Sequence, residues 1–473
     1  MLGIFKKADS PQYELFCCSV RGYSHIRKDT PCEDFCVKKD TPCEDYCIKK
    51  DCTGDGFRIF AVADGHGDPN CLRSSIGSEY ACRIACESLE NFARNVSENG
   101  FEDRLFDRLE CPKLMDRLIR SIIAKWTSAV DEQLSQNPLT DDEYAAASRL
   151  GDEYRRGIRT ERMYGTTLIA GLITEKYLLL IQQGDGRCVV FDSEGKAGQP
   201  IPWDDRCVGT ATTSLCDPDA VHSVRYHVIN VEENPVIACI VGTDGVEDSF
   251  PTSMEKTHAY YRNILKEACE MGVDAMEQAL SNDLSELSRK GSAADVSVSG
   301  FVDVKRTRKF LDEFENANQM VNILDELALV KNSIKSMESG GMLEHLAKTY
   351  DGLALSYRMA EEKYLELDQK CRELQEKIAA HEQTEIPEQD KLPFEIKELL
   401  SKLRFSKDLL APAKRELDSL TAQRDEAKKA YEEAATQMGC VEERYLPRKE
   451  RYEALLKQKN DILDRLSELE SKQ

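Results

Sequence analysis

Hydrophobic and polar positions follow two different patterns along the 473-residue chain. Up to about residue 305, short runs rich in β-branched residues end at Gly, Asp or Pro, which is typical of β-strands. Helical periods separate these runs near residues 70–95, 104–136 and 254–288. The predicted strands are YELFCCSV, DYCIKK, FRIFAVAD, TTLIAGLIT, YLLLIQQGD, RCVVFDS, SVRYHVI, VIACIVGTD and DVSVSGFVDV.

After residue 305 the strand pattern ends and a heptad pattern begins. Apolar or small residues recur three and four positions apart over 350–378, and a second series runs over 410–469. This spacing predicts a coiled coil. Two prolines in TEIPEQDKLP predict a turn near 384–395 between the two helices. An antiparallel hairpin is expected, and a parallel dimer of each helix is the alternative.

The two patterns predict four parts of the chain. These are an N-terminal tail (1–10), a domain of strands and helices (11–305), a connecting helix (306–340) and a coiled-coil helical hairpin (341–473). The coiled coil predicts self-association or a coiled-coil partner. Two roles are equally expected for residues 341–473. They form either a solvated spacer or dimerisation arm, or a surface that recognises a specific partner.

Composition narrows the choice of partners and of location. The formal net charge of −22 disfavours nucleic acid and anionic membranes, because phosphate contacts need clustered Lys and Arg. No signal peptide and no apolar run of about 20 residues is visible, so a cytoplasmic protein is expected. In that setting the 18 cysteines are expected to be reduced thiols.

One acidic segment of the sequence is repeated in tandem. Residues 28–38 read KDTPCEDFCVK and residues 39–49 read KDTPCEDYCIK, which gives the acidic pairs Glu33–Asp34 and Glu44–Asp45. The second copy lies 19 residues before Asp64, a distance that fits two strands joined by the turn TGDG. We therefore expect Glu44 and Asp45 to be the working pair. Glu33 and Asp34 are the alternative, because SVRGYSHIR directly precedes the first copy.

Aspartates recur at the ends of predicted strands, next to glycine or at a turn. Carboxylates placed in this way are suited to hard divalent cations such as Mg²⁺ and Mn²⁺, which prefer oxygen ligands. A single Asp-Gly is also a common turn signal, but four such corners together favour a metal site. The motifs are FAVADGHGD with Asp64, Gly65 and His66, QQGDGRCVV with Asp185, CIVGTDGVEDSF with Asp244, and GSAADVSVSGF with Asp295.

The order of these motifs resembles the metal-dependent serine/threonine protein phosphatases of type 2C, and among them the bacterial branch. The resemblance covers about residues 11–305. It implies an α+β fold in which two antiparallel β-sheets pack as a sandwich flanked by helices. It also implies a binuclear centre of two Mg²⁺ or Mn²⁺ ions and a phosphorylated protein as substrate, in bacterial signalling.

The resemblance also implies roles for individual residues. Asp64 would bridge both ions, the Gly65 carbonyl would bind one and Asp244 the other, while the acidic pair would order bound waters. Metal-bound hydroxide would then attack the phosphomonoester of Ser or Thr, and His66 would act as the general acid.

Two motifs depart from the family pattern. In AADVS, Ala294 occupies the position where the family has its last metal-binding aspartate. Asp295, the next residue, is the candidate substitute ligand. The arginine that binds phosphate in many relatives is absent at its usual spacing, and Arg27 is a nearby candidate. A phosphatase with an altered metal site is the favoured hypothesis. The alternative is a catalytically weakened or inactive pseudophosphatase that serves as a phosphoprotein-binding or coiled-coil scaffold module.

Overall fold

The chain divides into two structural units, Met1–Val321 and Asn322–Gln473. The computed structural model describes residues 11–28, 43–147, 150–209, 211–250, 254–382 and 410–471.

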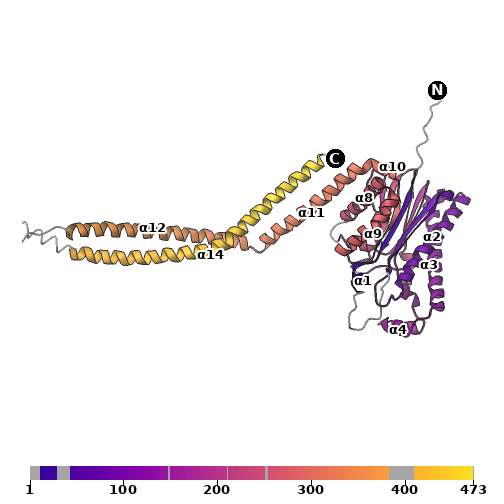
Figure 1. The fold of residues 1–473 in the computed structure, drawn as a ribbon, viewed down its shortest axis with the longest axis horizontal. Coiled ribbons are helices and arrows are strands. Elements are labelled where there is room, and N and C mark those ends of the chain that lie inside the picture. Colours follow the sequence, from indigo (N-terminus) through magenta and orange to yellow (C-terminus); the bar gives the residue numbers. More distant parts are fainter. Residues whose placement is uncertain are drawn as a thin grey trace, which may run out of the picture. The chain divides into compact units, whose positions relative to one another are not determined.

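Two antiparallel five-stranded sheets form the centre of the first unit (Figure 1). One sheet has the strand order β1-β10-β9-β6-β7 and the other has the order β2-β3-β4-β5-β8. Buried apolar side chains from both sheets form a common core, which includes Phe60, Ile169 and Phe301. The sheets therefore pack face to face, and the predicted sandwich is confirmed. The strands are β1 (Glu14–Val20), β2 (Tyr46–Cys52), β3 (Phe57–Ala63), β4 (Leu168–Thr174), β5 (Tyr177–Gln183), β6 (Arg187–Asp192), β7 (Ala197–Gly198), β8 (Arg225–Asn230), β9 (Val236–Gly242) and β10 (Val296–Val302).

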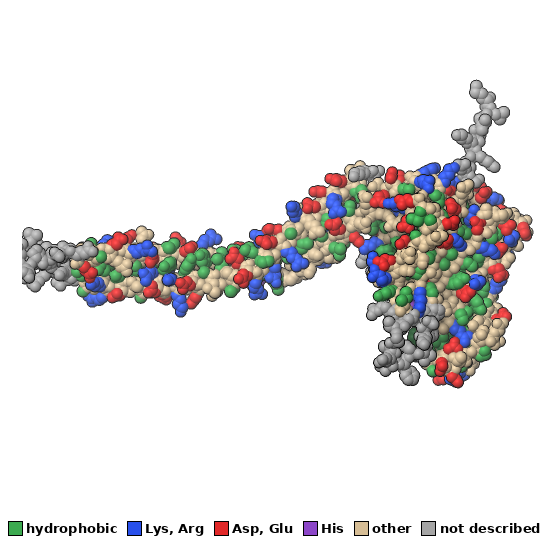
Figure 2. All heavy atoms as spheres, in the orientation of Figure 1, with side chains coloured by type: hydrophobic (Ala, Val, Ile, Leu, Met, Phe, Trp, Pro, Cys, Tyr) green, Lys and Arg blue, Asp and Glu red, His purple; other side chains and the backbone are tan. Residues whose placement is uncertain are grey.

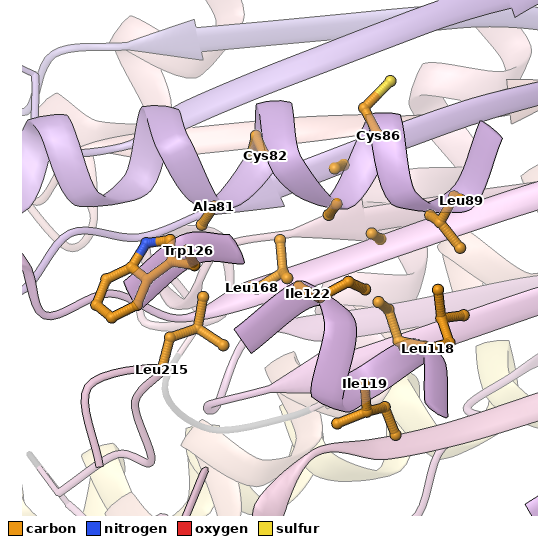
Figure 3. Close-up of a cluster of buried hydrophobic side chains, with 14 of the residues drawn as sticks. Ala81, Cys82, Cys86, Leu89, Leu118, Ile119, Ile122, Trp126, Leu168 and Leu215 are labelled. Carbon is orange, nitrogen blue, oxygen red and sulfur yellow. The ribbon is translucent and has the colours of Figure 1, made fainter. Parts of the chain in front are cut away.

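Long helices cover both outer faces of the sandwich. Helices α2 (Ser74–Glu98) and α3 (Glu110–Gln136) pack on the sheet that contains β3 and β4. Figure 3 shows the apolar cluster there, in which Trp126 is fully buried and donates its indole N–H to the carbonyl of Gly77 at 3.0 Å. Helices α8 (Met254–Met271) and α9 (Val273–Lys290) pack on the other sheet.

Shorter helices connect these elements. Thr140 caps one of them, because its hydroxyl accepts the backbone N–H of Glu143 while the Glu143 carboxylate accepts the N–H of Thr140. The short α-helices are α1 (Tyr23–Lys28), α4 (Asp141–Ala146), α5 (Gly151–Arg155), α6 (Ala220–Ser223), α7 (Asp244–Glu247) and α10 (Val304–Thr307), and the 3₁₀ helices are η1 (Thr53–Asp55), η2 (Glu102–Leu105), η3 (Thr160–Tyr164) and η4 (Arg308–Phe310).

Two local features differ from the sequence prediction. The single helical period predicted over 254–288 is two helices, because Gly272 adopts φ +88° between α8 and α9. Glycine reaches this left-handed region without steric cost, so the chain turns there. The short strand β7, which pairs with the end of β6, was not predicted because two residues carry no periodicity.

Helix α11 (Leu311–Ser339) begins in the first unit and ends in the second. In the first unit, the ring of Phe314 lies 5.7 Å from that of Phe191. In the second unit, Glu326 of this helix forms an ion pair of 2.8 Å with Arg465. Helix α11 therefore has its first residues in one unit and its last residues in the other.

Two long helices, α12 (Met342–Glu382) and α14 (Leu410–Glu470), lie side by side and antiparallel in the second unit (Figure 1). Tyr350 near the start of α12 packs on Tyr445 late in α14, with ring centroids 5.3 Å apart. Further along, the hydroxyls of Tyr357 and Tyr431 hydrogen-bond at 2.8 Å. The turn predicted over 384–395 lies outside the described residues.

Charged side chains of both signs lie along the visible face of the two helices, with hydrophobic side chains between them (Figure 2). Figure 2 shows Lys and Arg interspersed with Asp and Glu along the visible side of both helices. This alternation fits a pair of helices whose outer surface is solvated. Among the described helices, none is both long and apolar enough to cross a membrane.

Candidate functional site

Four strand ends meet at one end of the sandwich. Because neighbouring strands run antiparallel, the C-terminal ends of β3 and β9 lie beside the N-terminal ends of β2 and β10. Asp64 follows β3 and Asp244 follows β9, while Asp45 precedes β2 and Asp295 precedes β10. The turn between β5 and β6 adds Asp185, whose carboxylate accepts the Thr212 hydroxyl at 2.7 Å. The structure thus gathers carboxylates that are far apart in sequence.

Asp64 and Asp244 form the centre of this acidic group. Their carboxyl groups lie close enough for each to shift the pKa of the other. Burial and the negative charges of Asp244 and Asp45 raise the pKa of Asp64 well above its usual range. Burial, together with the charge of Asp185, raises the pKa of Asp244 to about 6. Carboxylates crowded in this way are stabilised when a cation lies between them.

The second copy of the repeated phrase contributes to the same group. Asp45 is 5% exposed, and its carboxylate accepts the Thr243 hydroxyl at 2.8 Å. Burial and the charge of Asp295 raise the pKa of Asp45 to about 8. The carbonyl of Glu44 accepts the N–H of Gly65 at 3.1 Å, so this pair is joined to the turn after β3. Glu33 and Asp34 of the first copy lie outside the described residues.

Asp295 is held by hydrogen bonds from two distant segments. Its Oδ1 accepts the N–H of Gly22 at 2.5 Å and contacts His25 Nδ1 at 2.9 Å. Its Oδ2 accepts the N–H of Glu44 at 2.5 Å. Burial alone would raise the pKa of Asp295, but these donors outweigh it and lower the pKa. Asp295 therefore connects the start of β10 with the turn before α1 and with the acidic pair.

Ala294 lies in a loop that packs on the turn containing Asp244. A Cβ on Gly245 would lie 2.1 Å from the carbonyl oxygen of Asp295, so the two backbones are in direct contact. The carbonyl of Gly245 also accepts the hydroxyl of Ser292 at 3.0 Å. A side chain longer than alanine at position 294 would thus start from a loop that touches the acidic group.

A pocket of about 470 Å³ opens beside the carboxylates. The ring of His66 is part of its lining, and the backbone N–H of His66 donates to the carbonyl of Gly165 at 3.0 Å. Burial lowers the pKa of His66, although the charge of Asp185 opposes this shift. Arg27 lies in α1, and its side chain is outside the described part of the chain. The pocket is lined by Asp64, His66, Gly67, Asp68, Cys71, Arg159, Arg162, Asp185, Gly209, Ala211, Thr212, Ser214, Cys216, Asp217, Asp244 and Asp248.

Several lining residues were not assigned to the site by sequence reasoning. Asp185 was among the four acidic corners predicted to favour a metal site but received no individual role, and its convergence with Asp64 requires the tertiary structure. Arg159, Arg162 and Asp217 lie in loops and follow no periodic pattern or metal-ligand spacing. Only the tertiary structure brings them to the pocket.

The donor atoms of this group suit a hard divalent cation. In the part of the chain that the structure describes, no three His, Cys, Asp or Glu side chains already form a metal-holding group. Mg²⁺, however, commonly uses one or two protein carboxylates and keeps several waters. The adjacent carboxylates of Asp64 and Asp244, with the backbone carbonyl of Gly65, fit such a water-rich site.

Gly65 has no space for a side chain. A Cβ there would lie 2.5 Å from the carbonyl oxygen of Glu44 and 2.9 Å from the backbone of Ser74. We expect Gly65→Ala to lower the free energy of unfolding by about 1–3 kcal/mol, because backbone atoms must move apart. Urea denaturation measures this change, and Gly54→Ala is the matched control because nothing lies within 4 Å of its Cβ position. Equal unfolding midpoints for the two variants would contradict the prediction.

Comparison with known proteins gives one family. The family model described as "Protein phosphatase 2C" matches residues 21–285, which is more than half of the chain. None of the curated proteins compared matches the chain.

Solved structures that match part of the chain include bacterial phosphatases. A bacterial serine phosphatase is 15% identical, with a TM-score of 0.37, over 62% of this chain and 97% of that chain. The Mycobacterium tuberculosis serine/threonine phosphatase PstP/Ppp is 18% identical, with a TM-score of 0.34, over 61% of this chain and 98% of that chain. The S. agalactiae serine/threonine phosphatase is 15% identical, with a TM-score of 0.35, over 62% and 99% of the two chains.

Proposed function

The chain belongs to the protein phosphatase 2C family, and on that ground we propose that it hydrolyses phosphomonoesters of Ser and Thr in phosphoproteins. The observation that supports this most is the convergence of Asp64, Asp244 and Asp45 at one end of the sandwich, beside a pocket. Two Mg²⁺ or Mn²⁺ ions are the proposed cofactors, and the cytoplasm is the proposed location.

The proposed metal ligands follow from this arrangement. Asp64 would contact both ions, the Gly65 carbonyl would contact one, and Asp244 would contact the other. Glu44 and Asp45 would act through water molecules. When bound, the ions would lower the pKa of a water molecule and neutralise charge on the phosphoryl group.

His66 is the proposed general acid. Its backbone is fixed by the hydrogen bond to Gly165, and His66 is one of the residues that line the pocket. Since burial lowers the pKa of His66, the protonated ring gives up its proton readily to the departing Ser or Thr oxygen. The charges of Asp185, Asp217 and Asp68 favour the protonated ring and so limit this lowering of the pKa.

For Asp295 we propose a positioning role in place of direct metal binding. Both of its carboxylate oxygens already accept hydrogen bonds, and these bonds hold Glu44 and the turn at Gly22. Releasing the carboxylate toward a metal would leave two backbone N–H groups unpaired, at about 1–3 kcal/mol each. The position of Ala294 would then provide no carboxylate to the second ion.

The test is hydrolysis of a phosphothreonine peptide by the full chain at increasing Mn²⁺ concentrations. We expect turnover by the wild type that depends on Mn²⁺. Ala294→Asp is expected to lower the Mn²⁺ concentration for half-maximal activity about tenfold or more, because it adds a negative charge beside Asp244. Ala294→Asn is the matched control, since it adds similar volume without charge.

Three results of this experiment can be distinguished. If Ala294→Asp and Ala294→Asn share the wild-type Mn²⁺ dependence, position 294 does not face the metal site. If the wild type is inactive and Ala294→Asp gains activity, the chain is a pseudophosphatase. If neither protein hydrolyses the peptide at any Mn²⁺ concentration, the proposed function is wrong.

The second unit has a separate proposed role. Helices α12 and α14 pair with each other, so each helix has its packing partner within the same chain. We propose that the hairpin acts as a spacer or as a surface for self-association.

A further inference from the structure

The pocket beside the carboxylates is lined by side chains of both charges. Its aspartates are Asp64, Asp68, Asp185, Asp217, Asp244 and Asp248. Arg159 and Arg162, from the segment that precedes β4, contribute positive charge to the same lining. The phosphate group of a phosphorylated substrate is negative and is repelled by these aspartates. Positive side chains in the pocket would offset this repulsion.

The backbone that carries the two arginines is fixed to the site. Arg159 adopts φ +55° and precedes the helix η3, in which the N–H of Arg162 donates to the carbonyl of Arg159 at 3.1 Å. The carbonyl of Arg162 accepts the N–H of Gly165 at 3.1 Å, and the carbonyl of Gly165 in turn accepts the N–H of His66. A short chain of hydrogen bonds therefore joins Arg162 to His66.

Close packing strengthens this connection. A Cβ on Gly165 would lie 2.7 Å from Cδ2 of the His66 ring, so the segment that follows Arg162 rests directly on that ring. On the other side, the carbonyl of Met163 accepts the N–H of Arg73 at 2.8 Å. The arginine segment is thus held between the pocket and the start of α2.

Neither guanidinium has an ion-pair partner among the described residues. Other arginines of this unit do have one, such as Arg73 with Glu143 and Arg187 with Glu247. The charge of Arg162 lowers the pKa of both His66 and Asp68, which shows that it lies near them. In a chain with a net charge of −22, two arginines without ion pairs at the pocket are available to a ligand.

We propose that Arg162 binds the phosphate group of the substrate and that Arg159, which is more exposed, contacts negative charge on the adjoining peptide. This inference rests on the proposed function and identifies the substrate class as a phosphopeptide. A guanidinium can donate two parallel N–H bonds to phosphate oxygens, which a lysine cannot do. The pair would supply the phosphate contact that is missing at the family spacing near residue 27.

The test compares Arg162→Gln, Arg162→Lys and Arg159→Ala with the wild type on a phosphothreonine peptide in Mn²⁺. We expect Arg162→Gln to raise KM and the inhibition constant of inorganic phosphate about tenfold or more, with partial recovery in Arg162→Lys. Arg159→Ala should raise KM for the peptide and leave inhibition by inorganic phosphate unchanged. Arg156→Ala is the matched control, because Arg156 is exposed and lies outside the pocket lining.

Binding measurements separate this inference from the proposed function. Calorimetry with the phosphothreonine peptide and its unphosphorylated form, in Mn²⁺, needs no turnover. If the wild type binds the phosphopeptide without hydrolysing it and Arg162→Gln weakens that binding, the proposed function fails and the inference stands. Equal phosphopeptide affinity or equal KM in the wild type and Arg162→Gln would overturn the inference. The same holds if the wild type does not prefer the phosphorylated form.

Discussion

Replacement of Asp64 by Asn is expected to lower kcat for Mn²⁺-dependent hydrolysis of a phosphothreonine peptide by about 10³-fold or more. The carboxylate lies beside Asp244, and we have proposed that it contacts both ions. An amide removes one negative charge from the point where the two cations would be closest. Because Asn has nearly the same shape, the turn after β3 should keep its hydrogen bonds to Thr167.

Asp103→Asn is the control for this variant. Asp103 is exposed in η2 and lies outside the pocket lining. The activity of Asp103→Asn should therefore equal that of the wild type. Binding of Mn²⁺, measured by calorimetry, should be weakened by Asp64→Asn alone. If Asp64→Asn retains activity within tenfold of the wild type, Asp64 is not a shared metal ligand and the proposed arrangement is wrong.

The second large effect concerns stability in the presence of a chelator. The pKa of Asp45 is about 8 in the folded protein and about 3.9 in an unfolded chain, so the folded state binds more protons between these values. The free energy of unfolding therefore falls as pH rises from about 4 to about 8. Asp45→Asn removes this cost, and its amide oxygen can still accept the Thr243 hydroxyl.

We expect Asp45→Asn to be more stable than the wild type by up to about 5 kcal/mol at pH 8 in EDTA, and the difference to disappear near pH 4. Urea denaturation over this pH range measures both values. In Mn²⁺ the order should reverse, since bound cations stabilise the wild-type carboxylate. An Asp45→Asn protein that is less stable than the wild type at pH 8 in EDTA would contradict the pKa assigned to Asp45.

The strands could be predicted because β-branched residues gather in short runs that end at Gly or Asp. Asp64 and Asp244 could be placed at the site for the same reason, since each directly follows such a run. The role of Asp295 could not be predicted. Its bond to the N–H of Glu44 joins residues 251 positions apart, and no local pattern specifies that contact. Arg162 was missed because it belongs to no periodic pattern in the sequence. Its position near His66 is visible only in the folded structure.

The heptad spacing predicted the helices α12 and α14 well, because long apolar series depend only on local periodicity. It could not decide their relative direction, since a parallel pair and an antiparallel pair bury the same positions. The contacts of Tyr350 with Tyr445 and of Tyr357 with Tyr431 show the antiparallel pairing.

Strand β2 is an edge strand, because among the described strands it pairs with β3 alone. Local unfolding of an edge strand breaks one ladder of hydrogen bonds and leaves the rest of the sheet intact. Opening of β2 would therefore remove Glu44 and Asp45 from the site, while Asp64 would stay at the end of β3 and Asp244 at the start of α7. The acidic pair thus belongs to the part of the site that can detach and return without global unfolding, and the hydrogen bond that the N–H of Glu44 donates to Asp295 opposes that opening.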